Sequence, residues 1–116
     1  MFCVTEGAEV YLYMQAADMR YGIDRLAEKI RAELNRLPLS GGAYVFFSRS
    51  RKKIKILYWD KDGYAMWLKR LEAGAFEVEV KNGYEQITGI DLKELLAGLD
   101  FSRIKLRKNI EKGLYS

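Results

Sequence analysis

The run of basic residues at positions 49–55 constrains the fold most strongly. Five of the seven residues from Arg49 to Lys55 are basic, and strand-like apolar segments lie on both sides, at 43–47 and 54–59. Burying several unpaired charges costs more free energy than folding supplies, so this run must lie at the surface. A connection of ~6 residues between two such segments is typical of a β-hairpin. We therefore expect a rigid hairpin with a cationic tip, a surface suited to a polyanion.

The size of the chain favours one domain. It has 116 residues, 49% of them hydrophobic, which is enough for a folded core. Lys and Arg number 20 against 16 Asp and Glu, and a net charge of +4 does not by itself demand nucleic acid. We predict a single α+β domain over residues 1–101 and a basic tail over 102–116. The tail could be an arm that orders on a partner or a disordered terminus.

Several function classes are disfavoured by residues that the chain lacks. Histidine is absent, which removes the usual general base near neutral pH and the commonest zinc ligand. The single cysteine, Cys3, cannot form an internal disulfide. The start of the sequence does not resemble a signal peptide, and no apolar run approaches the ~20 residues of a membrane span. We expect a cytoplasmic protein that is not an enzyme, uses no cofactor or metal and has no membrane partner.

Hydrophobic spacing predicts a strand followed by a long helix. Val10 to Met14 has strand composition. Apolar residues then recur at helical spacing from Ile23 to Leu37, which predicts a helix of roughly four to five turns with Asp18 as its N-cap. Pro38, the only proline, stops this helix.

The second half of the chain predicts a meander and a short helix. Strands are expected at 43–47, 54–59 and 64–71, with a turn at 60–63. Residues 76–80 alternate apolar and acidic, and a hairpin turn at 81–83 joins them to a strand at 84–87. Thr88 is the predicted N-cap of a short helix that ends near Gly98. The fold class is α+β, with a mainly antiparallel sheet of about four to five strands, one long N-terminal helix and one short C-terminal helix.

The basic hairpin is the main candidate site. Its cations could contact phosphate oxygens, in which case binding weakens steeply with salt; the alternative is a solvated turn. Aromatic neighbours could stack bases or belong to the core, and we favour the core for Tyr58 and Trp59, where they would hold the tip in place. Lys69 and Arg70 lie on the third predicted strand. At least one of them is expected to be exposed, where it could contact phosphate or form an ion pair with Glu72. The candidate nucleic-acid-binding residues are Arg49, Arg51, Lys52, Lys53 and Lys55, with Arg20, Lys69 and Arg70 nearby.

Four carboxylates could in principle bind magnesium for phosphoryl transfer. Asp18 and Asp24 suit the start of a helix, and Asp60 and Asp62 suit a turn, so structural roles explain all four. We predict no metal site and no nuclease.

Three blocks of sequence, taken in order, carry a resemblance to a known family. They are Asp18-Met19-Arg20-x-Gly22-Ile23-Asp24-x-Leu26, then Arg51-x-x-Ile54-Lys55-Ile56-Leu57-Tyr58-Trp59-Asp60-x-x-Gly63, then Lys69-Arg70-Leu71-Glu72-x-Gly74-x-Phe76. The chain, over about residues 8 to 101, resembles the TnpB accessory proteins, or second-open-reading-frame proteins, of the IS sixty-six family of bacterial insertion sequences. Ile23 and Phe101 depart from the Phe and Trp that relatives often have, and both remain apolar.

The resemblance implies a protein that assists transposition beside a separate, larger transposase and carries no strand-transfer chemistry. We therefore predict a non-catalytic accessory protein whose basic hairpin contacts the DNA backbone. The alternative is a protein-interaction module that docks onto the element's transposase without touching DNA.

Overall fold

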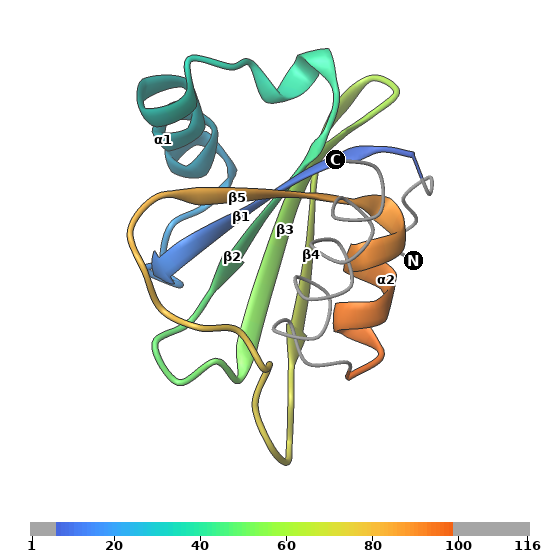
Figure 1. Ribbon diagram of the computed structural model, residues 1–116. Coiled ribbons are helices and arrows are strands. Elements are labelled where there is room, and N and C mark those ends of the chain that lie inside the picture. Colours follow the sequence, from blue (N-terminus) through green and yellow to red (C-terminus); the bar gives the residue numbers. More distant parts are fainter. Residues whose placement is uncertain (1–6, 99–116) are drawn as a thin grey trace, which may run out of the picture.

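Five strands form one sheet at the centre of the described part of the protein. The computed structural model describes residues 7–98, so Cys3 and the predicted tail at 102–116 lie outside the described residues. The strand order in the sheet is β4-β3-β2-β1-β5 (Figure 1). The strands are β1 (Glu9–Ala16), β2 (Ala43–Phe47), β3 (Lys53–Asp60), β4 (Gly63–Arg70) and β5 (Tyr84–Thr88).

The predicted fold class is wrong in the sheet and in the first helix. The sheet is mixed, because β1 and β2 are parallel while β2–β3, β3–β4 and β1–β5 are antiparallel. Helix α1 (Ile23–Leu34) makes the crossover between the parallel pair, which a tight turn cannot do. The predicted hairpin between 76–80 and 84–87 does not form, since β5 pairs with β1 at the far edge.

Helix α1 has 12 residues and is shorter than predicted. Asn35 adopts a left-handed conformation (φ 52°, ψ 42°), and its N–H donates to Arg31 O, so the helix ends there. Leu37 matches the apolar spacing but lies beyond the helix, half exposed. The predicted N-cap Asp18 is also wrong, because the N-cap position is Gly22.

Helix α2 (Gly89–Leu96) begins at the predicted N-cap, Thr88. The Thr88 hydroxyl accepts from the Asp91 N–H, and the Asp91 carboxylate accepts from the Thr88 N–H, which completes a capping box. Strand β5 therefore passes directly into α2.

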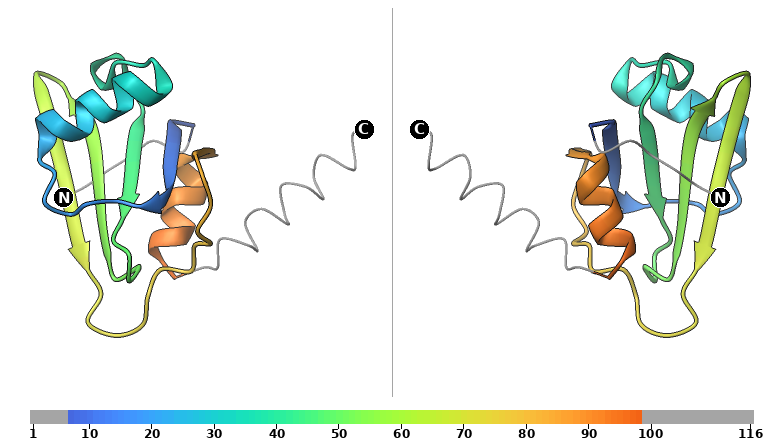
Figure 2. Two further views of the ribbon diagram at one scale, coloured as in Figure 1. Left: turned by 90° about the vertical axis from the view of Figure 1, so that its left-hand side faces the viewer. Right: turned by 90° about the vertical axis from the view of Figure 1, so that its right-hand side faces the viewer.

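The two helices lie on opposite faces of the sheet (Figures 1 and 2). One core cluster joins α1 to Tyr11, Tyr13, Phe46 and Leu57. The other joins α2 to the remaining face, built from the alternate strand residues Val10, Leu12, Met14, Val45, Phe47, Ile54 and Ile56. This arrangement buries both faces of the central strands, so β2 is apolar along its whole length.

Residues 71–83 cross the lower end of the sheet without forming a strand, contrary to prediction. Phe76 and Val78 are buried as the alternation predicted, whereas Val80 is two-thirds exposed. The Phe76 N–H donates to Arg51 O at 2.7 Å, and this segment therefore packs against the β2–β3 turn.

Candidate nucleic-acid interface

The predicted hairpin is confirmed, and three hydrogen bonds of Ser48 fix its tip. Ser48 lies at the start of the turn and is buried. Its carbonyl accepts from the Arg51 N–H at 3.0 Å, its hydroxyl accepts from the Lys53 N–H at 3.0 Å, and its own N–H donates to Lys53 O at 3.0 Å. Arg51 has φ 61°, an uncommon value for a residue other than glycine. The tip is thus a defined turn.

Three cations project from this tip. Arg49, Lys52 and Lys53 are all exposed. Within residues 7–98, no carboxylate forms an ion pair with any of them. Their charges are therefore available to an anion in solvent.

Strand β4 brings two more cations to the same end of the sheet. Arg70 is the partner of Lys53 across the β3–β4 ladder, and Lys69 is the partner of Ile54. The Leu71 N–H also donates to Lys52 O at 2.7 Å, which ties the end of β4 to the tip. Arg70 forms an exposed ion pair with Glu72 at 3.1 Å, whereas Lys69 has no such partner among the described residues. We call Arg49, Lys52, Lys53, Lys69 and Arg70 the basic corner.

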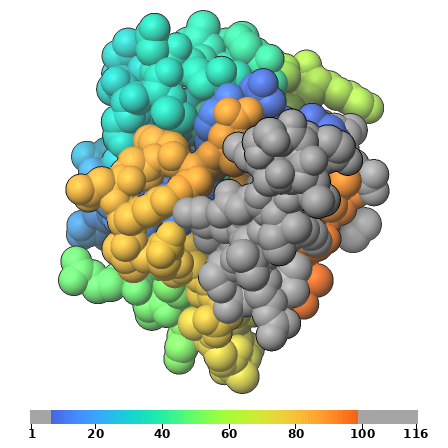
Figure 3. All heavy atoms as spheres, viewed as in Figure 1, coloured from blue at the N-terminus to red at the C-terminus, as the bar shows by residue number. Residues whose placement is uncertain are grey.

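The basic corner wraps around the sheet instead of occupying one face. Strand alternation places Lys53 and Arg70 on the face that carries α1 and Lys69 on the face that carries α2. In the space-filling view, the turn (green) and the start of the 71–83 segment (yellow) lie at the lower end of the molecule (Figure 3).

Arg51 does not project with its neighbours. Its side chain is turned inward and the residue is only 7% exposed. One terminal nitrogen, Nη2, donates to Met14 O at 2.9 Å, and the guanidinium lies 5.3 Å from the centre of the Phe47 ring. Burial lowers the pKa of Arg51, and its Nε and Nη1 donors have no hydrogen-bond partner among residues 7–98. Arg51 supports the turn from within.

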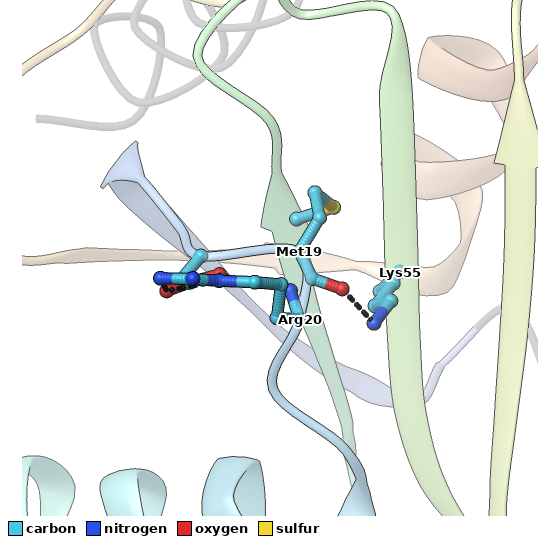
Figure 4. Close-up of polar contacts among 4 residues, drawn as sticks. Met19, Arg20 and Lys55 are labelled. Carbon is cyan, nitrogen blue, oxygen red and sulfur yellow. Dashed lines mark hydrogen bonds and ion pairs between the residues drawn. The ribbon is translucent and has the colours of Figure 1, made fainter.

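Lys55 is also engaged inside the protein. Its ammonium donates to Met19 O at 2.5 Å (Figure 4). It also donates to Tyr21 O at 3.0 Å, and both carbonyls belong to the segment between β1 and α1. Lys55 thereby fixes this segment against β3.

Arg20 lies in the segment that Lys55 fixes, but its side chain extends away from Lys55 (Figure 4). Its guanidinium donates to both carboxylate oxygens of Asp18, with a shortest distance of 2.7 Å. Hydrogen bonds from the Arg20 side chain and backbone N–H lower the pKa of Asp18 to about 2. Arg20 is exposed, and Asp18 offsets its charge.

The aromatic neighbours of the hairpin do not form an open stacking surface at the basic corner. Phe46 and Phe47 are completely buried. Tyr58 packs against the α2-side core. Trp59 packs edge-on against Tyr64, with ring centres 5.0 Å apart. Tyr58 and Trp59 lie near the end of β3 remote from the tip, so they do not hold the tip as predicted.

The four carboxylates considered for magnesium do not gather. Within residues 7–98, no group of three acidic, cysteine or histidine side chains is placed to hold a metal ion. The turn predicted at Asp60–Gly63 is confirmed, with Asp60 and Gly63 as the last partners of the β3–β4 ladder.

Sequence comparisons agree with the resemblance predicted from the motif blocks. Residues 8–106 match the family model described as IS66 Orf2 like protein. The uncharacterized protein y4jC of Sinorhizobium fredii is 29% identical over 109 residues, which cover 93% of this chain and 92% of that protein. The uncharacterized protein y4hO of the same organism is 31% identical over 97 residues, which cover 83% of this chain and 84% of that protein. No solved structure matches significantly. Neither helix in the described part of the chain is long and apolar enough to cross a membrane.

Proposed function

We propose, since the chain belongs to the IS66 Orf2-like family, that it is a non-catalytic accessory protein for transposition that contacts the DNA backbone through the basic corner. This family consists of accessory proteins that are not known to be catalytic. Such a protein would act in the cytoplasm, beside the element's DNA and transposase.

The observation that carries the proposal is the charge balance of the basic corner. Arg49, Lys52, Lys53 and Lys69 have no ion-pair partner among the described residues, and Glu72 is the carboxylate paired with Arg70. A phosphate that binds there displaces no ion pair that these four cations form within residues 7–98. Release of condensed counterions from DNA then favours binding. Contacts of this kind position a protein on DNA and carry little sequence information.

The remaining candidate residues take different roles in this proposal. Arg51 and Lys55 hold the tip and the segment before α1 in place, because their donors already bind backbone carbonyls. Arg20 is a flanking contact that a phosphate reaches by replacing Asp18 as its acceptor.

A matched pair of double variants tests the proposal. Lys52/Lys53→Gln removes two charges from the basic corner. Lys61/Lys93→Gln removes two exposed lysine charges elsewhere, one at the β3–β4 turn and one on α2. Fluorescence anisotropy with duplex DNA would be measured from low to moderate salt. We expect the slope of log K against log salt to fall by about 2 for the first variant and by much less for the control. Equal losses, or no binding by the unmodified protein at low salt, would reject the proposal.

Docking onto the transposase without DNA contact is the second candidate function. Leu37 and Leu39 each expose about half of their surface on either side of buried Pro38, in the segment that follows α1. Exposed apolar side chains at one place favour a protein partner. A pull-down of the neighbouring transposase that persists at high salt and is lost in Leu37/Leu39→Ser would support this alternative. Salt-sensitive capture that needs DNA would count against it.

A further inference from the structure

Within the described part of the chain, the outer side of β4 is an open sheet edge. Its eight residues pair with β3 in one unbroken register, from Lys53↔Arg70 to Asp60↔Gly63, without a bulge. None of the described strands pairs with its other side, and β4 lies at the margin of the sheet in both views of Figure 2. Edge strands that stay unpaired are usually short, bulged, charged or interrupted by proline. Strand β4 has eight residues with no bulge and no proline, and its charges, Lys69 and Arg70, stand only at its last two positions.

The outward backbone groups of β4 belong to alternate residues. Asp60 and Gly63 flank a two-residue turn, and such a turn is closed by a hydrogen-bonded pair. Gly63 therefore points its N–H and C=O toward β3, and the next outward groups belong to Tyr64, Met66, Leu68 and Arg70. The side chains of these four residues share the face that carries α1, where Met66 pairs with Leu57. Leu68 is 58% exposed there.

We infer that a second copy of this chain pairs with this edge, with β4 antiparallel to β4 and the two-fold axis at Met66. The two five-stranded sheets then form one sheet of ten strands. Closed two-fold symmetry is the commonest arrangement of protein dimers.

Charge and shape select the register at Met66. In this register Leu68 faces Tyr64 of the other copy, so an exposed leucine is covered by an aromatic ring. Arg70 faces Asp62 of the other copy and lies between that carboxylate and its own Glu72. The register centred on Trp67 places Arg70 opposite Tyr64 instead, with no opposing charge.

Opposite charges at the two ends of β4 favour a second copy over an unrelated strand. Lys69 and Arg70 stand at one end, and the β3–β4 turn at the other end carries Asp60, Lys61 and Asp62, with a net charge of −1. A parallel copy brings like charges together. An antiparallel copy matches both ends at once, which makes the edge complementary to itself.

The dimer has a consequence that rests on the proposed function. The two basic corners lie at opposite ends of the shared ladder, with eight residue steps, about 27 Å, between the two Arg70 positions. The basic corners of the two copies can contact the same DNA. This strengthens DNA binding by the dimer without any additional contact from either copy. The dimer itself does not require DNA.

Cysteine cross-linking tests the axis. Met66→Cys in a Cys3→Ser background places two thiols face to face across the two-fold axis. The control is Gln86→Cys in the same background, an exposed position on β5, the other edge of the sheet. We expect mild oxidation to yield a disulfide-linked dimer for Met66→Cys and little for Gln86→Cys. Comparable cross-linking of both, or none for either, would overturn the inference.

Charge reversal tests the register without relying on a single variant. Sedimentation velocity would be measured for Arg70→Asp, Asp62→Arg and the two combined. We expect each single variant to weaken dimerisation roughly tenfold and the combination to recover most of the loss. Lys52/Lys53→Gln should leave dimerisation unchanged, which separates this inference from DNA contact. A protein that stays monomeric at all concentrations, or that uses this edge to bind the transposase instead, would overturn the inference.

Discussion

The Arg51 guanidinium donates a hydrogen bond to the backbone carbonyl of Met14 at 2.9 Å, across 37 positions of sequence. The Lys81 N–H donates to the same carbonyl at 3.3 Å, and the Arg51 carbonyl accepts from Phe76. One residue at the hairpin tip therefore joins β1, the turn and the 71–83 segment.

Arg51→Ala should destabilise the fold. It removes a hydrogen bond from a charged donor and uncovers the Phe47 ring, so we expect the free energy of unfolding to fall by about 1–3 kcal/mol. Arg51→Met should cost less, because it keeps the packing and no longer buries a charge. Urea denaturation measures both. The control Lys52→Ala, exposed on the same turn, should change stability by under about 0.5 kcal/mol. A similar loss for the control would contradict this role for Arg51.

Lys55→Met should loosen the segment before α1. The carbonyls of Met19 and Tyr21 lose their shared donor, and we expect a loss of about 1–2 kcal/mol. Hydrogen exchange should accelerate in residues 17–22. Lys53→Met is the matched control, because Lys53 lies two residues earlier on the same face and is exposed. Exchange that is unchanged in Lys55→Met, or equally fast in both variants, would show that the ammonium does not hold this segment.

Thr88→Ala should weaken the start of α2. The reciprocal bonds between Thr88 and Asp91 are lost, at a cost of about 1 kcal/mol. Thermal unfolding measures the change, and Thr88→Ser should retain most of the stability because serine keeps the hydroxyl. A serine variant as unstable as the alanine variant would indicate that the methyl group matters instead.

Stability should decline at alkaline pH through Tyr84. Burial raises the pKa of Tyr84 above its ordinary value of 10.0, and the charge of nearby Glu33 raises it further. The folded state holds the Tyr84 proton more tightly than the unfolded state does. The contribution of Tyr84 to the free energy of unfolding is therefore complete below pH 10 and is lost as the pH rises above 10. Tyr84→Phe should flatten the fall in unfolding free energy between pH 10 and 12. An unchanged slope would assign the fall to other groups.

The β2–β3 hairpin and strand β4 could be predicted, because each pairs with a segment that is next to it in the sequence. The β2–β3–β4 meander joins neighbouring segments through short turns, and alternation within each strand identifies its buried face. The order strand, helix, strand at the start of the chain is typical of a parallel crossover, yet the following meander led to the antiparallel prediction. Nothing local shows that β5 pairs with β1, about 75 residues away.

The helix length and the site were predictable only in part. Leu37 continues the helical spacing of apolar residues, so the spacing predicts a helix that is too long. The left-handed conformation of Asn35, which ends α1, cannot be recognised from that spacing. The sequence shows where positive charge gathers, but not where each charge points. Lys55 alternates with Ile54 and Ile56 and pairs with Phe46, which places it on the face near α1. The Arg51 side chain points inward because it donates to the carbonyl of Met14, and the residues next to Arg51 in the sequence do not indicate this contact.

The place of β5 in the sheet bears on how the chain is made. Strand β1 leaves the ribosome before the other four strands and has apolar residues on both faces. Its neighbour on one side, β2, follows within about thirty residues, but its neighbour on the other side is β5, synthesised long afterwards. Until residues 84–88 emerge, β1 is a free apolar edge, the kind of surface that nascent chains aggregate through. Stalling or truncation between β4 and β5 is therefore the point in synthesis at which this small protein is most exposed to misassembly.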